Sequence, residues 1–284
     1  MVSTGAEVAT LVAFLIIATA VLILRCDIRY RILKNHGLDD VLVILAWCFA
    51  FSETSLIALN AGHPRKANLK IFLCTLLLHN FTLTCSKLSI LVQFCRVFPS
   101  PNRTAKACRI GIVVLVINAL VQTVLIIFHC QPVSAFWDVQ LLEEGRGICS
   151  SSKSLFYPSS IANLLTSIMV FGIPLPSIYN LRLGCKAKIS LLIVFGFGFV
   201  DLILSVVRII LTSISDPVVR ETGGTWSSLE STIAIICASA GALRPFISQS
   251  FSRFLFAVRN GRAVRSTYVK EEVDGTDSRS GESV

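Results

Sequence analysis

The sequence predicts an all-α membrane protein built as a bundle of seven transmembrane helices. Of its 284 residues, 54% are hydrophobic and only 15% are charged, whereas a soluble domain carries roughly 25% charged residues. The apolar residues form long runs, and a run of about 18 can cross a hydrocarbon core of roughly 30 Å. Lipid offers the backbone no hydrogen-bond partner, so such runs must be helical. They do not alternate as the strands of a β-barrel would.

The predicted spans occupy residues 6–24, 40–60, 70–95, 109–129, 155–180, 188–213 and 228–248. The first begins close to Met1 without a positive segment before it, so we expect it to be kept as a signal anchor. Pro174 and Pro176 should kink or end the fifth span, because each removes a helical donor. The bundle is expected to fill residues 1–248. The tail, 249–284, is expected to form a short basic amphipathic helix over 249–266 and then a disordered acidic, Ser-rich end.

Basic residues alternate between the loops, and this alternation predicts the orientation. The first, third and fifth loops and the tail are richer in Lys and Arg than the loops between them, although the second loop argues mildly the other way. Because positive residues stay in the cytosol, the N-terminus should lie outside and the tail in the cytosol. The net charge of +9 therefore indicates topology and a bilayer partner, and no nucleic acid is expected. Without a retention signal at the C-terminus, the plasma membrane is the expected location.

Two cysteines differ from the other eight of the chain's ten, most of which lie in or beside spans. Cys130 and Cys149 both fall in the outer loop between the fourth and fifth spans. That loop would face an oxidising compartment, where disulfides persist. We therefore predict a disulfide between them, with a pair of free thiols as the alternative.

Charges inside spans are costly and usually face the interior of a bundle. Glu53 in the second span, with His79 and Asn80 in the third, should form a polar cluster in the outer half. That cluster is either a cavity for a ligand or a hydrogen-bond network that holds helices together. Asp201 in the sixth span is a further candidate for the cavity, and it shares a helix face with Arg208 seven residues later.

Three other charged residues have less specific interpretations. Lys87 and Arg208 are expected toward the cytosolic ends of their spans, where either could extend its charge to the interface. Glu230 is expected near the outer end of the seventh span, in contact with water, and Arg244 at its other end. The seventh span has no Lys, so a retinal Schiff base and hence a retinal cofactor are not expected. The sequence also shows no phosphate-binding loop, metal-ligand spacing or nucleophile elbow.

A series of landmarks runs in order through residues 20–248. It consists of Asp39 and Asp40, Lys87, Arg96, Cys130-Gln-Pro, Phe136-Trp-Asp138, Cys149, Asn163, Pro174-Leu-Pro176, Arg208, Trp226 and Glu230. Together they resemble the fungal rhodopsin-like-domain membrane proteins, a group also named after a satratoxin-cluster membrane protein. The resemblance implies a seven-helix fold and a fungal source. That family commonly has an acidic residue where this chain has Ser167, and Asp201 is an acid that the family pattern does not include.

The resemblance implies function only broadly. Some relatives look like G-protein-coupled receptors, and others sit in secondary-metabolite gene clusters. We expect a receptor-like or accessory membrane protein without catalysis, with a small lipophilic ligand near Glu53, His79 and Asn80 and a G protein as a candidate partner. One alternative is a cyclase-like membrane enzyme in which Glu53 and Asp201 protonate a lipophilic substrate. The other is a transporter, which the lack of visible inverted repeats disfavours.

Overall fold

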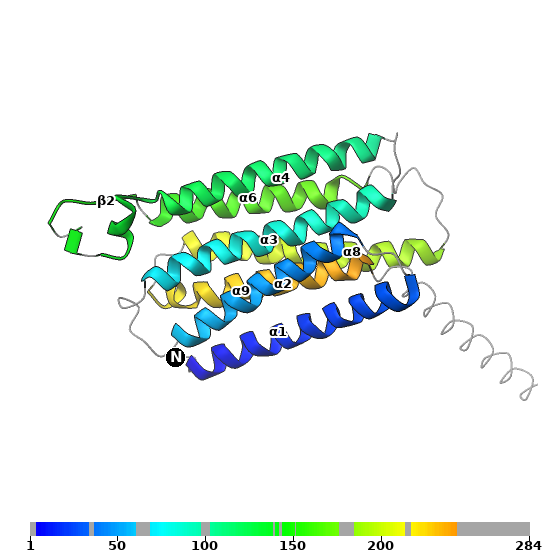
Figure 1. Ribbon diagram of the computed structural model, residues 1–284, viewed down its shortest axis with the longest axis horizontal. Helices are drawn as coiled ribbons and strands as arrows, with labels where there is room; N and C mark the ends of the chain where they lie inside the picture. The colour runs from blue at the N-terminus through cyan, green and yellow to red at the C-terminus, as the bar shows by residue number, and fades with distance from the viewer. Residues whose placement is uncertain are drawn as a thin grey trace, which may run out of the picture.

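The computed structural model describes residues 4–33, 37–60, 69–97, 103–138, 140–141, 144–150, 152–175, 185–213 and 217–242. These residues form a bundle of long, roughly parallel and antiparallel helices with one short ribbon at its end (Figure 1). The predicted tail, 249–284, and Arg244 lie outside them. The long helices are α1 (Thr4–Asp27), α2 (Leu38–Asn60), α3 (Leu69–Val97), α4 (Arg103–Ile127), α6 (Ser152–Gly172), α8 (Cys185–Ser213) and α9 (Pro217–Ala242).

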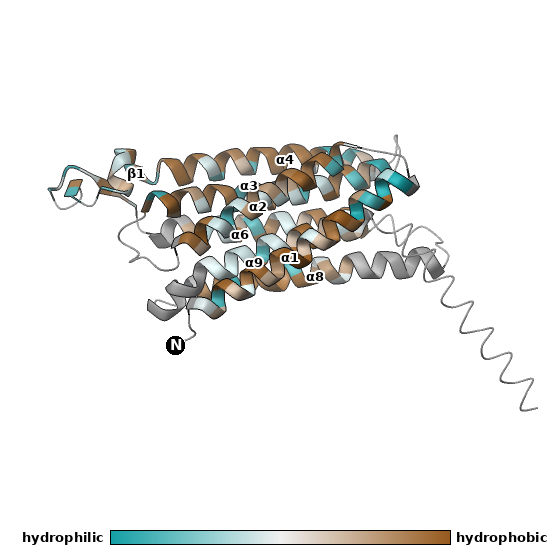
Figure 2. Ribbon diagram, turned by 60° about the horizontal axis from the view of Figure 1, so that its bottom comes forward, coloured by the Kyte–Doolittle hydropathy of each residue, from teal (hydrophilic) through white to brown (hydrophobic). Residues whose placement is uncertain are grey.

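Four of the described helices are long and apolar enough to cross a membrane, namely Gly5–Arg31, Leu38–Leu59, Leu69–Arg96 and Thr104–Ile127. Their outward faces are apolar (Figure 2). Ile16 on α1 is 62% exposed and Ile110 on α4 is 65% exposed. Rows of such residues would form a large apolar patch in water, whereas in lipid they are solvated. The chain is therefore an all-α, multi-pass membrane protein.

The structure moves several of the predicted helix boundaries, including the start of α4, which lies at Arg103 and not at 109. α6 ends at Gly172, just before Pro174, as expected of a proline that kinks or ends the span; the remainder of the predicted fifth span, 176–180, lies outside the described residues. α9 begins at Pro217, whereas the sequence placed that span from 228 because residues 217–227 are polar. Proline suits the first turn of a helix, since its missing N–H has no partner there anyway. α1 continues into a π-helical turn, η1 (Ile28–Leu33).

The core lies where α3 and α9 meet the other helices. α3 contacts α2, α4 and α9, and α9 also contacts α1, α2 and α8. Ala46, Ala50 and Ala238 are buried in this core, and small residues let transmembrane helices approach closely. Between α6 and α8, a Cβ atom at Gly198 would overlap the ring of Phe171. The helices are thus close enough for buried polar side chains to reach across several interfaces.

A two-stranded ribbon lies at the end of the bundle where the N-terminus also lies (Figure 1), which we call the ribbon end. Strand β1 (Cys130–Gln131) pairs antiparallel with β2 (Ile148–Cys149), and a short 3-10 helix, η3 (Val133–Phe136), lies between them. The structure joins Cys130 and Cys149 in the disulfide expected from the sequence. The cross-link closes a loop with a sequence separation of 19.

Aromatic side chains attach the ribbon to the start of α3. The ring of Phe72 stacks on Phe136 with centroids 6.4 Å apart, and Lys70 Nζ lies 5.4 Å from the ring centroid of Trp137. His129 lies edge-on to Phe136, and its partial burial lowers the pKa of its imidazole. The disulfide therefore fixes a segment that also contacts the helix carrying His79.

Replacing Cys130 by serine is expected to lower the free energy of unfolding by about 2–4 kcal/mol, because an open loop of this size gains entropy on unfolding. The effect is measured as the midpoint of thermal unfolding in detergent, which is monitored by size-exclusion chromatography. Cys48→Ser is the control, since Cys48 is a free, exposed cysteine. Equal midpoints for the two variants would show that the disulfide does not stabilise the bundle.

Candidate functional site: a buried polar network

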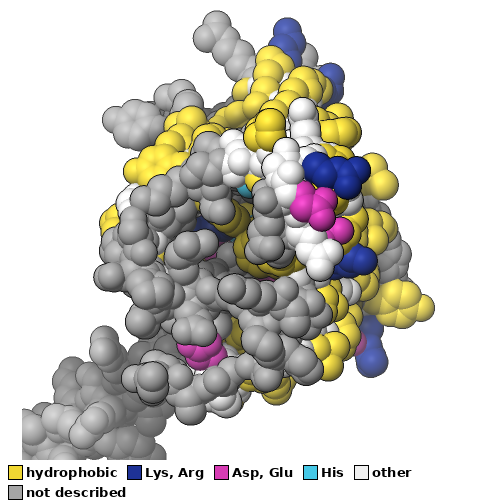
Figure 3. All heavy atoms as spheres, turned by 90° about the vertical axis from the view of Figure 1, so that its left-hand side faces the viewer, with side chains coloured by type: hydrophobic (Ala, Val, Ile, Leu, Met, Phe, Trp, Pro, Cys, Tyr) yellow, Lys and Arg dark blue, Asp and Glu magenta, His cyan; other side chains and the backbone are white. Residues whose placement is uncertain are grey.

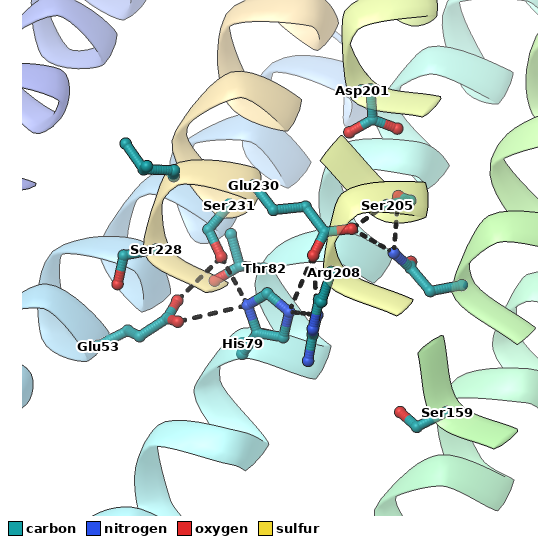
Figure 4. A network of polar contacts seen from close by, with 12 residues as sticks. Glu53, His79, Thr82, Ser159, Asp201, Ser205, Arg208, Ser228, Glu230 and Ser231 are labelled. Atoms are coloured by element: carbon teal, nitrogen blue, oxygen red, sulfur yellow. Dashed lines mark hydrogen bonds and ion pairs between the residues drawn. The ribbon is translucent and has the colours of Figure 1, made fainter. Parts of the chain in front are cut away.

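Four ionisable side chains from four helices meet in the half of the bundle nearer the ribbon end (Figure 4). His79 on α3 lies between two carboxylates. Its Nδ1 is 3.3 Å from Glu53 Oε1 on α2, and its Nε2 is 3.7 Å from Glu230 Oε2 on α9. Arg208 Nη1 on α8 is 2.8 Å from Glu230 Oε2 and also contacts His79 Nε2. Ser231 Oγ donates to Glu53 Oε2 (3.0 Å) and lies 2.8 Å from His79 Nδ1.

The network continues to α6 through the second oxygen of Glu230. Glu230 Oε1 accepts hydrogen bonds from Ser205 Oγ and Asn163 Nδ2, each 2.7 Å long. Lys87 Nζ in turn donates to the backbone oxygen of Asn163 (2.8 Å), to its Oδ1 (2.5 Å) and to Thr166 Oγ1 (2.9 Å). We call this set the polar network; it joins α2, α3, α6, α8 and α9 through Glu53, His79, Lys87, Asn163, Thr166, Ser205, Arg208, Glu230 and Ser231.

Three of the sequence interpretations were wrong. Glu230 is only 1% exposed, so it is not in contact with bulk water. Lys87 is 4% exposed and points into α6 instead of extending to the interface. Arg208 lies near the ribbon end and not the opposite end, because α8 runs toward the ribbon end and Arg208 is in its last two turns. These charges remain buried because each contacts an oppositely charged or hydrogen-bonding partner.

The structure also separates residues that the sequence grouped. Glu53 and His79 are together, but Asn80 points to α4, where its Nδ2 donates to Ala119 O (3.3 Å) and Thr123 Oγ1 (3.1 Å). The reason is that consecutive helical residues are about 100° apart around the axis. Asp201 is two turns from Arg208 and contacts Ser167 instead. Ser205 was missed, although it lies four residues after Asp201 and three before Arg208, on the same face.

A small cavity lies beside the polar network, between α3, α4, α6 and α8. Its volume is about 30 Å³, enough for one or two water molecules. His79, Asn80, Lys87 and Arg208 are among the polar residues that line it, and Phe156 contributes to its apolar wall. Glu53 and Asp201 are not in the lining. The space-filling view of the ribbon end shows a central hollow in which charged and histidine atoms are visible (Figure 3).

A second ionic cluster lies at the opposite end of the bundle. Arg25 on α1 contacts Asp39 Oδ2 (2.8 Å) and Asp40 Oδ1 (2.9 Å) at the start of α2. Arg29 contacts Asp39 Oδ2 (2.6 Å), and Arg96 in the last turn of α3 lies 3.3 Å from Asp39 Oδ1. We call these five residues the Arg25–Asp39 cluster. Arg25 and Asp39 are both 0% exposed.

Hydrogen bonds extend this cluster to α9 and along α3. Arg25 Nη1 and Gln93 Nε2 both donate to the backbone oxygen of Ala238, at 2.7 and 3.1 Å. Ser89 Oγ donates to the backbone oxygen of Asp39 (2.8 Å). The cluster therefore holds four helices, α1, α2, α3 and α9, at the end opposite the polar network.

Comparison with known sequences decides the family. The sequence model of the fungal rhodopsin domain matches residues 24–249, which include both ionic clusters, the ribbon and the cavity. The chain belongs to the fungal rhodopsin domain family. This confirms the resemblance inferred from the ordered landmarks. No solved structure matches the chain.

Several curated fungal proteins are similar to this member of the fungal rhodopsin domain family. "Fugralins biosynthesis cluster protein 2" of Gibberella zeae is 24% identical over 215 residues, which cover 69% of this chain and 53% of that protein. "Wortmanamides biosynthesis cluster protein C" of Talaromyces wortmannii is 24% identical over 261 residues, which cover 84% of this chain and 69% of that protein. "Receptor GIN3" of Arthrobotrys oligospora is 26% identical over 187 residues, which cover 63% of this chain and 44% of that protein. The chain thus spans about half the length of the first of these proteins.

The departure of this chain from the fungal rhodopsin domain pattern has a structural counterpart. Ser167 on α6 is the position at which the resemblance led us to expect an acid. Its hydroxyl donates to Asp201 Oδ2 on α8, 3.1 Å away. Ser167 is 0% exposed and Asp201 is 4% exposed. The carboxylate is therefore present at the same α6–α8 interface, but it is supplied by the other helix.

The landmark Trp226 and the glycine just before the Asp39–Asp40 landmark lie in different parts of the bundle. Trp226 lies half-buried on α9, one turn before Glu230. Gly37 lies against the Arg25–Asp39 cluster, and a Cβ atom there would overlap the guanidinium of Arg96 and the carboxylate of Asp39. The absence of a side chain at Gly37 thus lets Arg96 reach Asp39.

Replacing Gly37 by alanine is expected to displace Arg96 and to lower the free energy of unfolding by about 1–3 kcal/mol, the usual cost of overpacking. Thermal unfolding of the purified protein in detergent measures the loss. Gly196→Ala is the matched control, because nothing lies within 4 Å of a Cβ atom at that position. A midpoint for Gly37→Ala equal to that of the control would mean that Arg96 moves aside without cost.

Proposed function

We propose that this chain is a seven-span, receptor-like protein of a fungal membrane, in which a small lipophilic ligand acts on the polar network. The observation that carries the proposal is the network itself, which places charged side chains from α2, α8 and α9 around the buried imidazole of His79 on α3. Ionisable groups inside a bundle are costly and usually serve a function. A ligand that replaces one of these contacts would change the relative positions of the helices.

The proposed orientation has the ribbon end outside the cell and α6, α8 and α9 as the last three spans. Two features support it. The Cys130–Cys149 disulfide lies at the ribbon end, and disulfides persist in oxidising compartments. Arg25, Arg29 and Arg96 lie at the opposite end, as expected of cytosolic residues. α6 has 21 residues and is about 32 Å long at 1.5 Å per residue, enough for a hydrocarbon core of roughly 30 Å.

The ligand and partner belong to the same proposal. The cavity beside Lys87 and Arg208 has a volume of only about 30 Å³, so a ligand that enters it would separate the neighbouring helices. The buried Lys87 amine already donates to Asn163 and Thr166, and 217–242 contain no Lys, which argues against a covalently bound retinal. The proposed partner is a cytosolic G protein that binds near Arg96, whose side chain is 37% exposed. Signalling from the plasma membrane to a metabolite pathway would suit relatives named as a receptor and as biosynthesis cluster proteins.

The test is a deletion strain of the source fungus, complemented with the wild-type chain or with Arg208→Gln. We expect the deletion to change transcripts of a metabolite pathway, and the wild-type chain to restore them. Arg208→Gln should restore less than about a tenth of the response, because glutamine cannot keep the charge contact with Glu230. Transcripts and small molecules are measured together, and protein in the membrane fraction is quantified by immunoblot.

Arg146→Gln is the matched control for this test, because Arg146 pairs with Glu144 on the exposed ribbon and should complement fully. One result would overturn the proposal: accumulation of a single precursor while the transcripts stay level. The chain would then be an enzyme or a transporter, and Glu53→Gln and Asp201→Asn would be the next variants to test.

A further inference from the structure

A groove on the outer surface of α1 and α2 is separate from both ionic clusters. Its volume is about 890 Å³, within the range of sites for small molecules. One wall is formed by Ile23 of α1, and the other by Ile44 and Trp47 of α2. Ile23 is 64% exposed and Ile44 is 42% exposed. The groove therefore opens toward the lipid and not toward the interior of the bundle.

The length of the groove matches one leaflet of a bilayer. Along α1 and η1 its lining runs from Thr19 to Arg31, a distance of at most about 18 Å at 1.5 Å per residue. Half of a hydrocarbon core of roughly 30 Å is about 15 Å. The groove can thus hold one amphipathic molecule with its polar end at the interface and its apolar end near the middle of the bilayer.

The end near the bilayer centre offers a flat apolar wall. The ring of Trp47 stacks on Phe51 with centroids 5.5 Å apart. The indole Nε1–H of Trp47 donates to Thr19 Oγ1 (2.9 Å), so this donor is already used within the protein. A rigid, flat hydrocarbon fits such a wall with less loss of entropy than a flexible acyl chain, because it has few rotatable bonds to order.

The interfacial end is polar but neutral. Arg31 Nε lies 2.5 Å from Asp27 Oδ1, and these side chains are 76% and 51% exposed. An anionic phosphate approaching Arg31 would also meet the carboxylate of Asp27, which repels it. A hydroxyl group, in contrast, can donate to Asp27 and accept from Arg31. The neutral ion pair therefore favours an uncharged hydroxyl head.

We propose that this groove is a binding site for a membrane sterol, with the sterol hydroxyl at Asp27 and Arg31 and its ring system against Trp47. The site is independent of the proposed receptor function, since it shares no residue with the polar network. The bound sterol would cover the α1–α2 interface on the lipid side.

The test uses the full chain in nanodiscs that contain a trace of a photoreactive, clickable ergosterol analogue. After illumination, labelled peptides are identified by mass spectrometry. We expect labelling on peptides of α1 and α2 that excess unlabelled ergosterol removes. Ile44→Trp and Ile23→Trp fill the groove from its two walls and should each reduce this labelling by about fivefold or more, equivalent to ~1 kcal/mol.

Ile117→Trp on α4, which is 55% exposed and outside the groove, should leave the labelling unchanged. Size-exclusion chromatography verifies that each variant is folded. Equal labelling of the Ile44→Trp, Ile23→Trp and Ile117→Trp proteins would overturn the proposal. So would an equally strong, competed labelling of the same peptides by a photoreactive phosphatidylcholine, which would show that the groove takes ordinary bilayer lipid.

Discussion

Replacing Arg25 by alanine is expected to lower the free energy of unfolding by about 3–5 kcal/mol, the cost of removing one partner from a buried ion pair. Asp39 and Arg25 are both fully buried. The variant removes charge contacts with Asp39 and Asp40 and a hydrogen bond to the backbone of Ala238. Arg29 and Arg96 remain near Asp39, but the side chains of both are more exposed than that of Arg25.

The measurement is the unfolding midpoint of the purified protein in detergent, with the amount in the membrane fraction as a second readout. Arg146→Ala is the control, because its exposed pair with Glu144 should contribute about 0–1 kcal/mol. Arg25→Lys should lie between the two, since an ammonium keeps the charge but lacks the planar fork that reaches both carboxylates and the Ala238 oxygen. A midpoint for Arg25→Ala equal to that of Arg146→Ala would exclude a stabilising role for the cluster.

The ordered landmarks predicted the family, and the hydrophobic runs predicted the approximate helices because such runs report directly on burial in lipid. It failed at α9, where residues 217–227 are too polar for a hydropathy argument and are nevertheless helical. A helix end needs only satisfied backbone groups, so polar residues are compatible with it. The end of α6 at Gly172 was easier to predict, because Pro174 cannot continue the helical hydrogen-bond pattern.

The sequence predicted several residues of the polar network, but it did not predict which of them contact each other. Glu53 and His79 could be paired because both lie at a similar depth in their spans. Arg208 was assigned to the wrong end because its depth was counted without following the direction of its helix. Asn163 was recognised only as a family landmark. Its contact with Glu230 depends on how α6 faces α9, and no periodicity within one helix determines that.

Moving the acid back to α6 is the second change with a large expected effect. Ser167→Asp alone would place a second buried carboxylate against Asp201, and an uncompensated buried charge costs about 3–5 kcal/mol. We expect a corresponding fall in the unfolding midpoint in detergent. Ser167→Asn is the matched control, since asparagine has nearly the same size as aspartate, carries no charge and can still donate to Asp201.

The double variant Ser167→Asp with Asp201→Ser separates position from charge. It places the acid at position 167 on α6, where the family resemblance led us to expect it, and leaves a hydroxyl on α8 to donate to it. If the interface needs only one carboxylate, the double variant should recover most of the stability lost in Ser167→Asp, which gives a coupling free energy of about 2–3 kcal/mol between the two sites. Additive losses would mean that the carboxylate must come from α8, because its position relative to Lys87 and the polar network then matters more than its presence at the interface.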